Sequence, residues 1–525
     1  MQLRQGLGAA ELVVPQQRRR PPLRAPAPRP GARRAPPPPA ASAAASAAPD
    51  APPTPTLPVF SGKVDWTVMY KQVLQASRDL KVDAFWFQGP RNVALRHPDD
   101  VALVCRDSDC FTKGDGMQRI HAWLGDGLVA TADAALHDGM RELLIPAFVA
   151  AAVKGFAPDF AKVGEEVADV LELMDGREYD IERLCRRATL DVIGRAGFGH
   201  DFQGVKFAAA EARGEAAAGR GSPSEGAIGD GFVDVISVFD ALLLPAFMLL
   251  ARPLEPEANI PGIEGYHRSI RLLDDVIERM VEVRRSRGIS PGDNSLLSHM
   301  LRAQQAGNGM VTDKQMRDQL QTFFFAGSDT TATTLCFALY QLSRHPEVLE
   351  ACLEEVDSIM GDAPSDSLSS EDYGRMKLLA GVANETLRMF PAAPSVSRRC
   401  AQDVTIRGHA IPAGTRVVVS LYGMQRHEDY WPRPDEWLPE RWLPANAPTM
   451  APHADKAFMP FTVGPRACIG KYFALIELQV LLAVILRRIA PGPAAGRGEL
   501  DTWQNLTLCA AGGAPIVPRR RRRRA

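Results

Sequence analysis

The sequence predicts a mainly helical fold with small β-sheets, an α+β protein. Helical periodicity dominates from Val59 onward, and strand-like runs such as "RNVAL", "DVTIRG" and "TRVVVSL" are short. No internal repeat is present, and 46% of the 525 residues are apolar, which is ample for a sizeable core. We therefore expect residues 59–518 to form one unit.

Both ends of the chain are basic, although the formal net charge is only -1. Residues 1–58 are rich in Arg, Pro, Ala and Ser and cannot bury enough apolar surface to offset their chain entropy. This composition predicts an organelle transit peptide, with a merely disordered extension as the alternative. Residues 519–525 hold six consecutive arginines, which predict a solvated, disordered tail rather than a nucleic-acid site.

No apolar run is long enough to predict a transmembrane helix. The segment "ALLLPAFMLLA" at 241–251 is expected to belong to the core, and a surface patch that dips into a bilayer is the alternative. The eight cysteines show no close repeated spacing, so we expect free thiols rather than a disulfide framework.

A long helix is predicted after Thr312, which can cap it, and before Pro346, which stops it. Its centre reads "AGSDTT", residues 326–331. Threonine hydroxyls that bond back to the preceding turn predict a local distortion here. Ala326 and Gly327 would leave room beside the backbone for a ligand, with Asp329 and Thr330 next to that space. Close packing of a buried helix is the alternative.

A carboxylate and two arginines predict a buried network. Glu385 and Arg388 lie at i, i+3 on one helix face, a spacing that is common on exposed surfaces. Arg441, in the segment "WLPERW", is expected to join them and to fix this segment to the helix.

The stretch "FTVGPRACIG" carries a solitary cysteine, Cys468, between Gly464 and Gly470. The glycines permit a tight turn, and a helix is predicted directly after it. A sulfur at a helix N-terminus near Arg466 is expected to favour the thiolate. One thiolate is a poor zinc site but a good single axial ligand.

With these motifs the chain resembles the cytochrome P-450 superfamily over about residues 59–518. Phe461, Gly464, Arg466, Cys468 and Gly470 match the family's haem loop, and Ala326 to Thr331 match its central-helix pattern. Glu385 with Arg388, and Pro439 to Trp442, match two further motifs in the family's order.

The resemblance implies haem b with Cys468 as its thiolate ligand. It implies that Asp329 and Thr330 deliver protons to bound dioxygen, that Ala326 and Gly327 lie against the haem, and that Phe461 and Gly470 belong to its loop. Cations for the propionates would come from His137 and Arg141 at i, i+4, and from Arg398 and Arg466. The family often has Trp where this chain has His137, which weakens that one assignment.

The activity implied is a monooxygenase acting on a hydrophobic substrate, such as a terpenoid, carotenoid, sterol or fatty acid. Phe323 to Phe325, Val396 and residues 117–130 are expected to line its pocket. Electrons from NADPH would come through a separate ferredoxin or flavoprotein reductase. Alternatives are a peroxide isomerase or dehydratase, disfavoured by Asp329 and Thr330, and a haem-binding sensor without turnover. The leader favours a plastid over a mitochondrion or the cytosol, and peripheral membrane contact stays open.

Overall fold

The computed structural model describes residues 57–87, 91–114, 119–215, 235–251, 257–307, 309–449 and 453–521. Long helices and short strands make up this part of the chain, which confirms the predicted α+β class. The predicted leader up to residue 56, residues 115–118 of the predicted pocket lining and arginines 522–524 of the predicted tail lie outside the described residues.

The helices supply most of the core. They are α1 (Met69–Leu80), α2 (Pro98–Arg106), α3 (His121–Leu124), α4 (Ala134–Phe148), α5 (Ala150–Lys154), α6 (Ala157–Leu173), α7 (Glu182–Val192), α8 (Gly204–Ala212), α9 (Val235–Ala251), α10 (Ile263–Arg287), α11 (Leu296–Gln305), α12 (Asp313–Arg344), α13 (Pro346–Met360), α14 (Ser370–Arg375), α15 (Lys377–Met389), α16 (Leu421–Met424) and α17 (Lys471–Arg488).

The strands are short. They are β1 (Val59–Phe60), β2 (Ala84–Phe87), β3 (Asn92–Leu95), β4 (Phe111–Thr112), β5 (Tyr179–Asp180), β6 (Ser395–Cys400), β7 (Val404–Ile406), β8 (His409–Ile411), β9 (Arg416–Ser420), β10 (Ile489–Pro493), β11 (Thr502–Gln504), β12 (Leu508–Ala510) and β13 (Pro515–Arg520). Each of the three strand-like runs in the sequence supplies one of them, as β3, β7 and β9.

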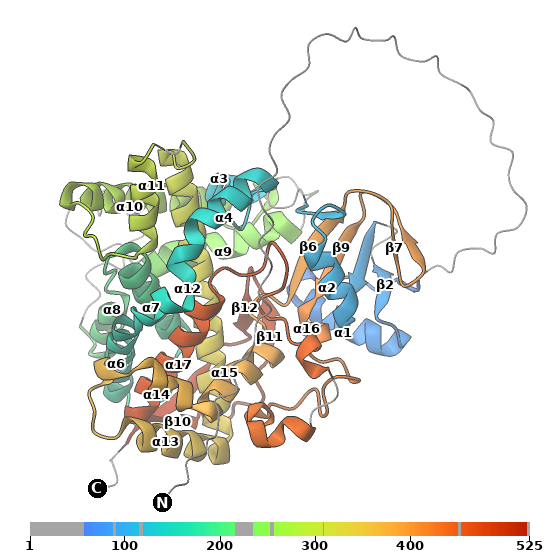
Figure 1. Cartoon of the computed structure of the whole chain (residues 1–525). Coiled ribbons are helices and arrows are strands. Elements are labelled where there is room, and N and C mark those ends of the chain that lie inside the picture. Colours follow the sequence, from blue (N-terminus) through green and yellow to red (C-terminus); the bar gives the residue numbers. More distant parts are fainter. Residues whose placement is uncertain are drawn as a thin grey trace, which may run out of the picture. The chain divides into compact units, whose positions relative to one another are not determined.

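A six-stranded sheet in the order β1-β2-β3-β9-β6-β4 carries residues of the site. Its centre pairs Val93 with Val417 in parallel, and Val396 with Val419 in antiparallel orientation. Helices α1 and α2 lie next to this sheet (Figure 1). Because Val396 and Arg398 belong to β6, the sheet fixes the positions of both.

Helix α12 passes through the helical part of the chain, where it contacts α7, α15 and α17 (Figure 1). The hydroxyl of Thr312 accepts a hydrogen bond from the backbone N–H of Gln315 at 3.1 Å, so the predicted cap is confirmed. Thr330 Oγ1 bonds back to the carbonyl of Ala326 at 2.9 Å, as expected. The helix nevertheless continues as an α-helix through this region, so the predicted distortion does not interrupt it.

A π-helical stretch occurs instead opposite the centre of α12, at Ile193–Phe198. A Cβ at Gly327 would lie 2.9 Å from Cγ1 of Ile193. The space expected beside Gly327 for a ligand is therefore filled by Ile193 on that side, and close helix packing explains this glycine.

The first members of the arginine run are ordered by pairing, so the prediction of a disordered tail is wrong for them. Arg519 and Arg520 lie in β13, where they pair with Ala490 and Ile489 of β10. Arg521 forms an ion pair with Asp357 at 2.5 Å. The backbone of β10 and the carboxylate of α13 account for this order, and neither is visible from composition.

The apolar segment at 241–251 forms most of α9, and its core assignment is confirmed. Leu242, Ala246 and Leu249 are buried, whereas Leu244 remains exposed. No helix among the described residues has both the length and the apolar character needed to cross a bilayer.

Candidate active site

The loop around Cys468 is a closed turn that leads into α17. The backbone N–H of Cys468 donates to the carbonyl of Phe461 at 2.9 Å, and that of Ala467 to Gly464 at 3.0 Å. Gly464 has φ +84°, and a Cβ there would lie 2.3 Å from the carbonyl oxygen of Cys105. The turn therefore requires glycine at this position.

Cys468 is exposed, whereas the other cysteines of the described chain are buried or partly buried. Burial by the surrounding protein nevertheless raises the pKa of its thiol, against the backbone N–H of Gly470, Arg141 and Lys471. The expectation that Arg466 and the helix end favour the thiolate is therefore wrong for the protein alone. Surrounded but accessible sulfur fits a metal ligand, because a coordinating metal ion deprotonates the thiol.

Cations without counter-ions surround this loop. Among the described residues, Lys113, Arg141, Arg398 and Arg466 have no carboxylate within ion-pair distance. Each donates a hydrogen bond to a backbone carbonyl: Arg141 to Ala467 at 2.8 Å, Arg398 to Ser397 at 3.0 Å, Arg466 to Thr131 at 3.1 Å, and Lys113 to Val129.

Lys113 is the member of this cluster that no sequence motif indicated. Burial, together with Arg398 and Arg466, lowers the pKa of Lys113 to about 7. Burial likewise lowers the pKa of Arg398 and Arg466. Uncompensated, partly desolvated cations fit the two propionates of haem b, so the residues present suit that group.

His137 differs from these cations. It is buried on α4, and its Nδ1 lies 2.8 Å from Oδ1 of Asp138. Burial lowers the pKa of His137, which favours the neutral imidazole. Arg141, one turn later, contacts the cysteine loop directly.

Asp329 and Thr330 lie on α12 with different surroundings. Asp329 is buried, accepts a hydrogen bond from the hydroxyl of Thr507 at 2.5 Å, and lies 3.6 Å from Nε of Arg186. Thr330, like Ala326, is partly accessible in the middle of a helix that is otherwise largely buried. The accessible side of α12 thus carries the threonine, and the acid faces a polar cluster.

That cluster was not predicted from the sequence. Arg186 of α7 also contacts Asp240 of α9 at 2.7 Å and Glu182 at 3.3 Å. Burial raises the pKa of Glu182 to about 7; Arg186 opposes this shift, and the neighbouring carboxylates Asp180, Asp329 and Asp240 add to it. Glu182 and Arg186 share an i, i+4 spacing on α7, but no local spacing relates them to Asp240 of α9 or Asp329 of α12.

The predicted network of Glu385, Arg388 and Arg441 is brought together in the structure. Glu385 and Arg388 are fully buried, and Arg441 donates from Nε to Glu385 Oε1 at 3.0 Å. Trp442 Nε1 donates to Glu385 Oε2 at 2.9 Å. The network joins α15 to the segment before the cysteine loop, as expected.

Only part of the predicted apolar lining faces accessible space. Phe323 is buried and stacks on Phe148 at 5.2 Å, and Phe324 is buried and stacks on Phe198 at 4.9 Å. Phe325 alone of the three is partly accessible, as is Val396. The expectation for Phe323 and Phe324 is wrong because consecutive helix residues point about 100° apart.

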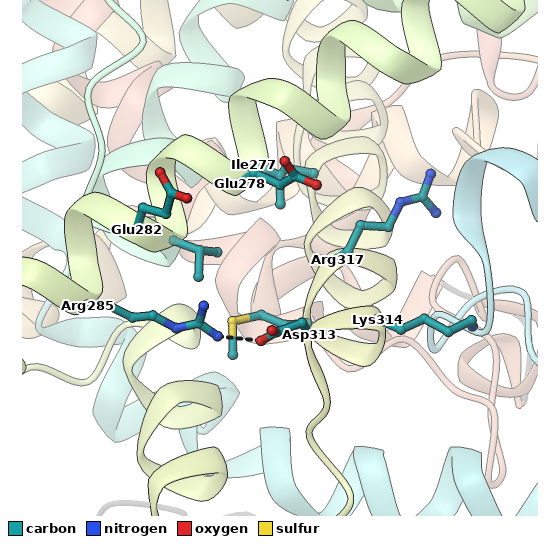
Figure 2. Close-up of a pocket in the computed structure, with 9 residues that line it drawn as sticks. Ile277, Glu278, Glu282, Arg285, Asp313, Lys314 and Arg317 are labelled. Atoms are coloured by element: carbon teal, nitrogen blue, oxygen red, sulfur yellow. Dashed lines mark hydrogen bonds and ion pairs between the residues drawn. The ribbon is translucent and has the colours of Figure 1, made fainter.

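A separate surface cavity of about 380 Å³ lies between α10 and the start of α12 (Figure 2). Its lining includes Glu278, Glu282 and Arg285 of α10, and Asp313 pairs with Arg285 across it. Lys314 and Arg317 extend from α12 away from these side chains (Figure 2). Cys468 and Thr330 do not belong to this cavity.

Comparison with known proteins agrees with this geometry. A family profile described as Cytochrome P450 matches residues 52–491. Cytochrome P450 4d2 of Drosophila melanogaster is 27% identical over 459 residues, covering 82% of this chain and 85% of that protein. Cytochrome P450 4F8 of Homo sapiens is 29% identical over 416 residues, covering 75% of each chain.

Among solved structures, the heme domain of cytochrome P450DA superposes with a TM-score of 0.75 at 25% identity, covering 89% of this chain and 98% of that chain. The profile spans most of the sequence and includes the cysteine loop, the central helix and the buried Glu–Arg network. The chain therefore belongs to the cytochrome P450 family, haem b monooxygenases that receive electrons from NAD(P)H through a redox partner.

Proposed function

We propose that this chain inserts one oxygen atom of O2 into a hydrophobic organic substrate, with Cys468 as the proximal haem ligand. The observation that carries the proposal is an accessible sulfur in a glycine-closed turn, surrounded by cations that lack carboxylate partners. When bound, haem b supplies the oxidation chemistry, and the protein supplies binding, orientation and protons.

Four side chains would hold the haem carboxylates. Arg141, Arg398 and Arg466 are the predicted ones, and Lys113 joins them because it shares their desolvated, carbonyl-bonded environment. Burial, and then repulsion from Arg398 and Arg466, lowers the pKa of Lys113, and charge-assisted bonds to two carboxylates would offset both effects. His137 serves as a neutral packing residue in this proposal. Phe461 and Gly470 shape the loop, and Ala326 is the small residue on the accessible side of α12.

Thr330 and Asp329 would deliver protons. The hydroxyl of Thr330 is partly accessible and can release its bond to the Ala326 carbonyl to donate into the site. Asp329, the preceding residue, holds its carboxylate in the polar cluster, where Thr507 and Arg186 fix its orientation. The excess of carboxylates around Arg186 means that this cluster can hold a proton close to Asp329.

Two partly accessible apolar side chains, Phe325 and Val396, support a hydrophobic substrate. A terpenoid, carotenoid, sterol or fatty acid fits such a wall, with electrons arriving from a ferredoxin or a flavoprotein reductase. Screening these classes for a spin-state shift of the haem would identify the substrate. Reconstitution with each reductase type would identify the partner.

The test of the haem assignment is a reduced carbon-monoxide difference spectrum of the purified protein. We expect the red-shifted Soret band of a thiolate-ligated haem, and we expect Cys468→His to abolish that shift. Cys110→Ser, which removes a partly exposed thiol elsewhere in the chain, should leave the band unchanged. A red-shifted band that survives in Cys468→His would refute the assignment.

We also propose that residues 1–58 direct the chain to a plastid, on the basis of their Arg-, Pro- and Ala-rich, acid-poor composition. A fluorescent protein fused behind these residues should enter the organelle. Retention of the fusion in the cytosol would refute organelle targeting, and fluorescence in mitochondria would indicate mitochondrial instead of plastid targeting.

A further inference from the structure

One face of α12 holds Trp123 of α3 at three points. Arg317, Gln321 and Phe325 follow at i, i+4 and i+8, so they lie one above the other along the helix. Arg317 donates to the carbonyl of Trp123 at 2.7 Å, and Gln321 Oε1 accepts from the indole Nε1 at 3.1 Å. The Trp123 ring packs edge-on against Phe325, with centroids 5.3 Å apart.

The two polar members of this row are themselves fixed from outside. Asp274 of α10 accepts a hydrogen bond from Arg317 Nε at 2.6 Å and another from Gln321 Nε2 at 2.9 Å. Arg317 also donates to the carbonyl of Ala122 at 3.0 Å. Backbone and indole of Trp123 are therefore both bound to side chains that have little freedom of their own.

The loop directly after Trp123 packs closely against α12. A Cβ at Gly125 would lie 2.1 Å from Cγ of Asp318, and one at Gly127 would lie 1.9 Å from Oγ1 of Thr322. Asp318 accepts the N–H of Asp126 at 2.9 Å. The loop backbone therefore touches α12 directly, and Trp123 cannot move away without breaking these contacts.

Phe325 is the partly accessible end of this row. Trp123 and Gln321 are fully buried, whereas Phe325 is partly accessible and directly precedes Ala326 and the Thr330 turn. We propose that Trp123 is a positioning residue that fixes the Phe325 ring and thereby sets the size of ligand admitted beside Thr330. This inference rests on the proposed function, because it places the haem-facing ligand space at Phe325.

The size of that space can be measured without knowing the substrate. Imidazole and 4-phenylimidazole bind haem iron through nitrogen and shift the Soret band, and they differ by one aromatic ring. Trp123→Leu removes the indole ring that packs against Phe325, so the Phe325 ring can rotate into the vacated volume and leave more room for a ligand. We expect the ratio of the Kd for 4-phenylimidazole to that for imidazole to fall about tenfold in this variant.

Two variants separate positioning from general packing. Trp123→Phe keeps an aromatic ring behind Phe325 and should leave the ratio within about twofold of the wild type. Phe337→Leu is the matched control: Phe337 is also buried on α12, but it packs on Phe390 at 5.6 Å. It should lower thermal stability and leave the ratio unchanged. An unchanged ratio in Trp123→Leu, or an equal change in Phe337→Leu, would overturn the proposal.

Amide hydrogen exchange tests the role of Trp123 even if the wild type or a variant fails to bind haem. A wild type without a Soret band would refute the proposed function, and exchange then tests the row of contacts separately. Peptides covering residues 121–131 should exchange faster in Trp123→Leu than in the wild type, and no faster in Phe337→Leu. Equal protection of these peptides in both variants would show that Trp123 fixes nothing, and would overturn the inference.

Discussion

Glu385 receives two hydrogen bonds from Arg388, at 2.8 and 2.9 Å, and neither side chain is exposed to solvent. Burial alone would raise the pKa of Glu385, but Arg388 and Arg441 outweigh it and hold the pKa below its usual range. Arg388 also donates to the carbonyls of Gln425, Pro434 and Glu436. This single ion pair therefore connects α15 to the segment that leads to the cysteine loop.

Replacing the carboxylate tests this connection. Glu385→Gln leaves Arg388 and Arg441 buried without a counter-charge, which should cost about 3–5 kcal/mol of unfolding free energy. Urea unfolding of the haem-loaded protein would measure the loss. Glu436→Gln breaks an exposed pair with Arg433 and should give no measurable change. Equal stability of the two variants would contradict the importance of the buried network.

Lys113 should make the haem-free protein more stable as pH rises from about 7 to about 10.5. Its pKa is lowered from 10.5 to about 7 in the folded chain, so between these values the unfolded chain binds more protons. Unfolding free energy should therefore rise as pH increases from about 7 to about 10.5. Lys113→Met should flatten this rise, as measured by urea unfolding at both ends of the range.

The same variant should lose haem faster, because one propionate partner is missing. Transfer of haem to excess apomyoglobin would measure the rate. Lys456→Met removes an exposed lysine and should change neither the pH dependence nor the transfer rate. Unaltered haem retention in Lys113→Met would remove Lys113 from the propionate site.

The hydroxyl of Thr330 should determine the fraction of consumed NADPH that is coupled to product formation. Thr330→Ala removes the proton donor, so the rate of product formation should fall about 10²-fold. NADPH consumption should continue, and its electrons should appear in hydrogen peroxide. Thr330→Ser keeps the hydroxyl and should restore most of the coupling. Full coupling in Thr330→Ala would show that proton delivery does not need the Thr330 hydroxyl.

Glu182 should make stability fall as pH rises from about 4.5 to about 7. Burial raises its pKa to about 7, so between the ordinary value of 4.5 and 7 the folded chain binds more protons than the unfolded chain. Unfolding free energy then decreases across this window, by at most about 3 kcal/mol. Glu182→Gln should flatten the decrease, and Glu178→Gln, an exposed neighbour, should not. An identical slope in both variants would exclude Glu182 as the titrating group.

The sequence by itself determined the features that are local along the chain. The turn at Cys468 needs glycine at Gly464, the helix from Thr312 to Pro346 has its own start and stop signals, and Glu385 with Arg388 needs only an i, i+3 spacing. These signals depend on neighbours within a few residues, so they can be interpreted without the fold.

Only the tertiary structure decided which distant side chains meet. Arg186 reaches Asp329 from α7, Lys113 joins Arg398 and Arg466 across the sheet, and Trp123 packs on Phe325. Phe323 and Phe324 turned out to be core because the packing partners of each helix face, not its composition, determine accessibility. Strand pairing with β10 also determined the structure of Arg519 and Arg520. This pairing uses backbone hydrogen bonds, so the side chains of the arginine run do not predict it.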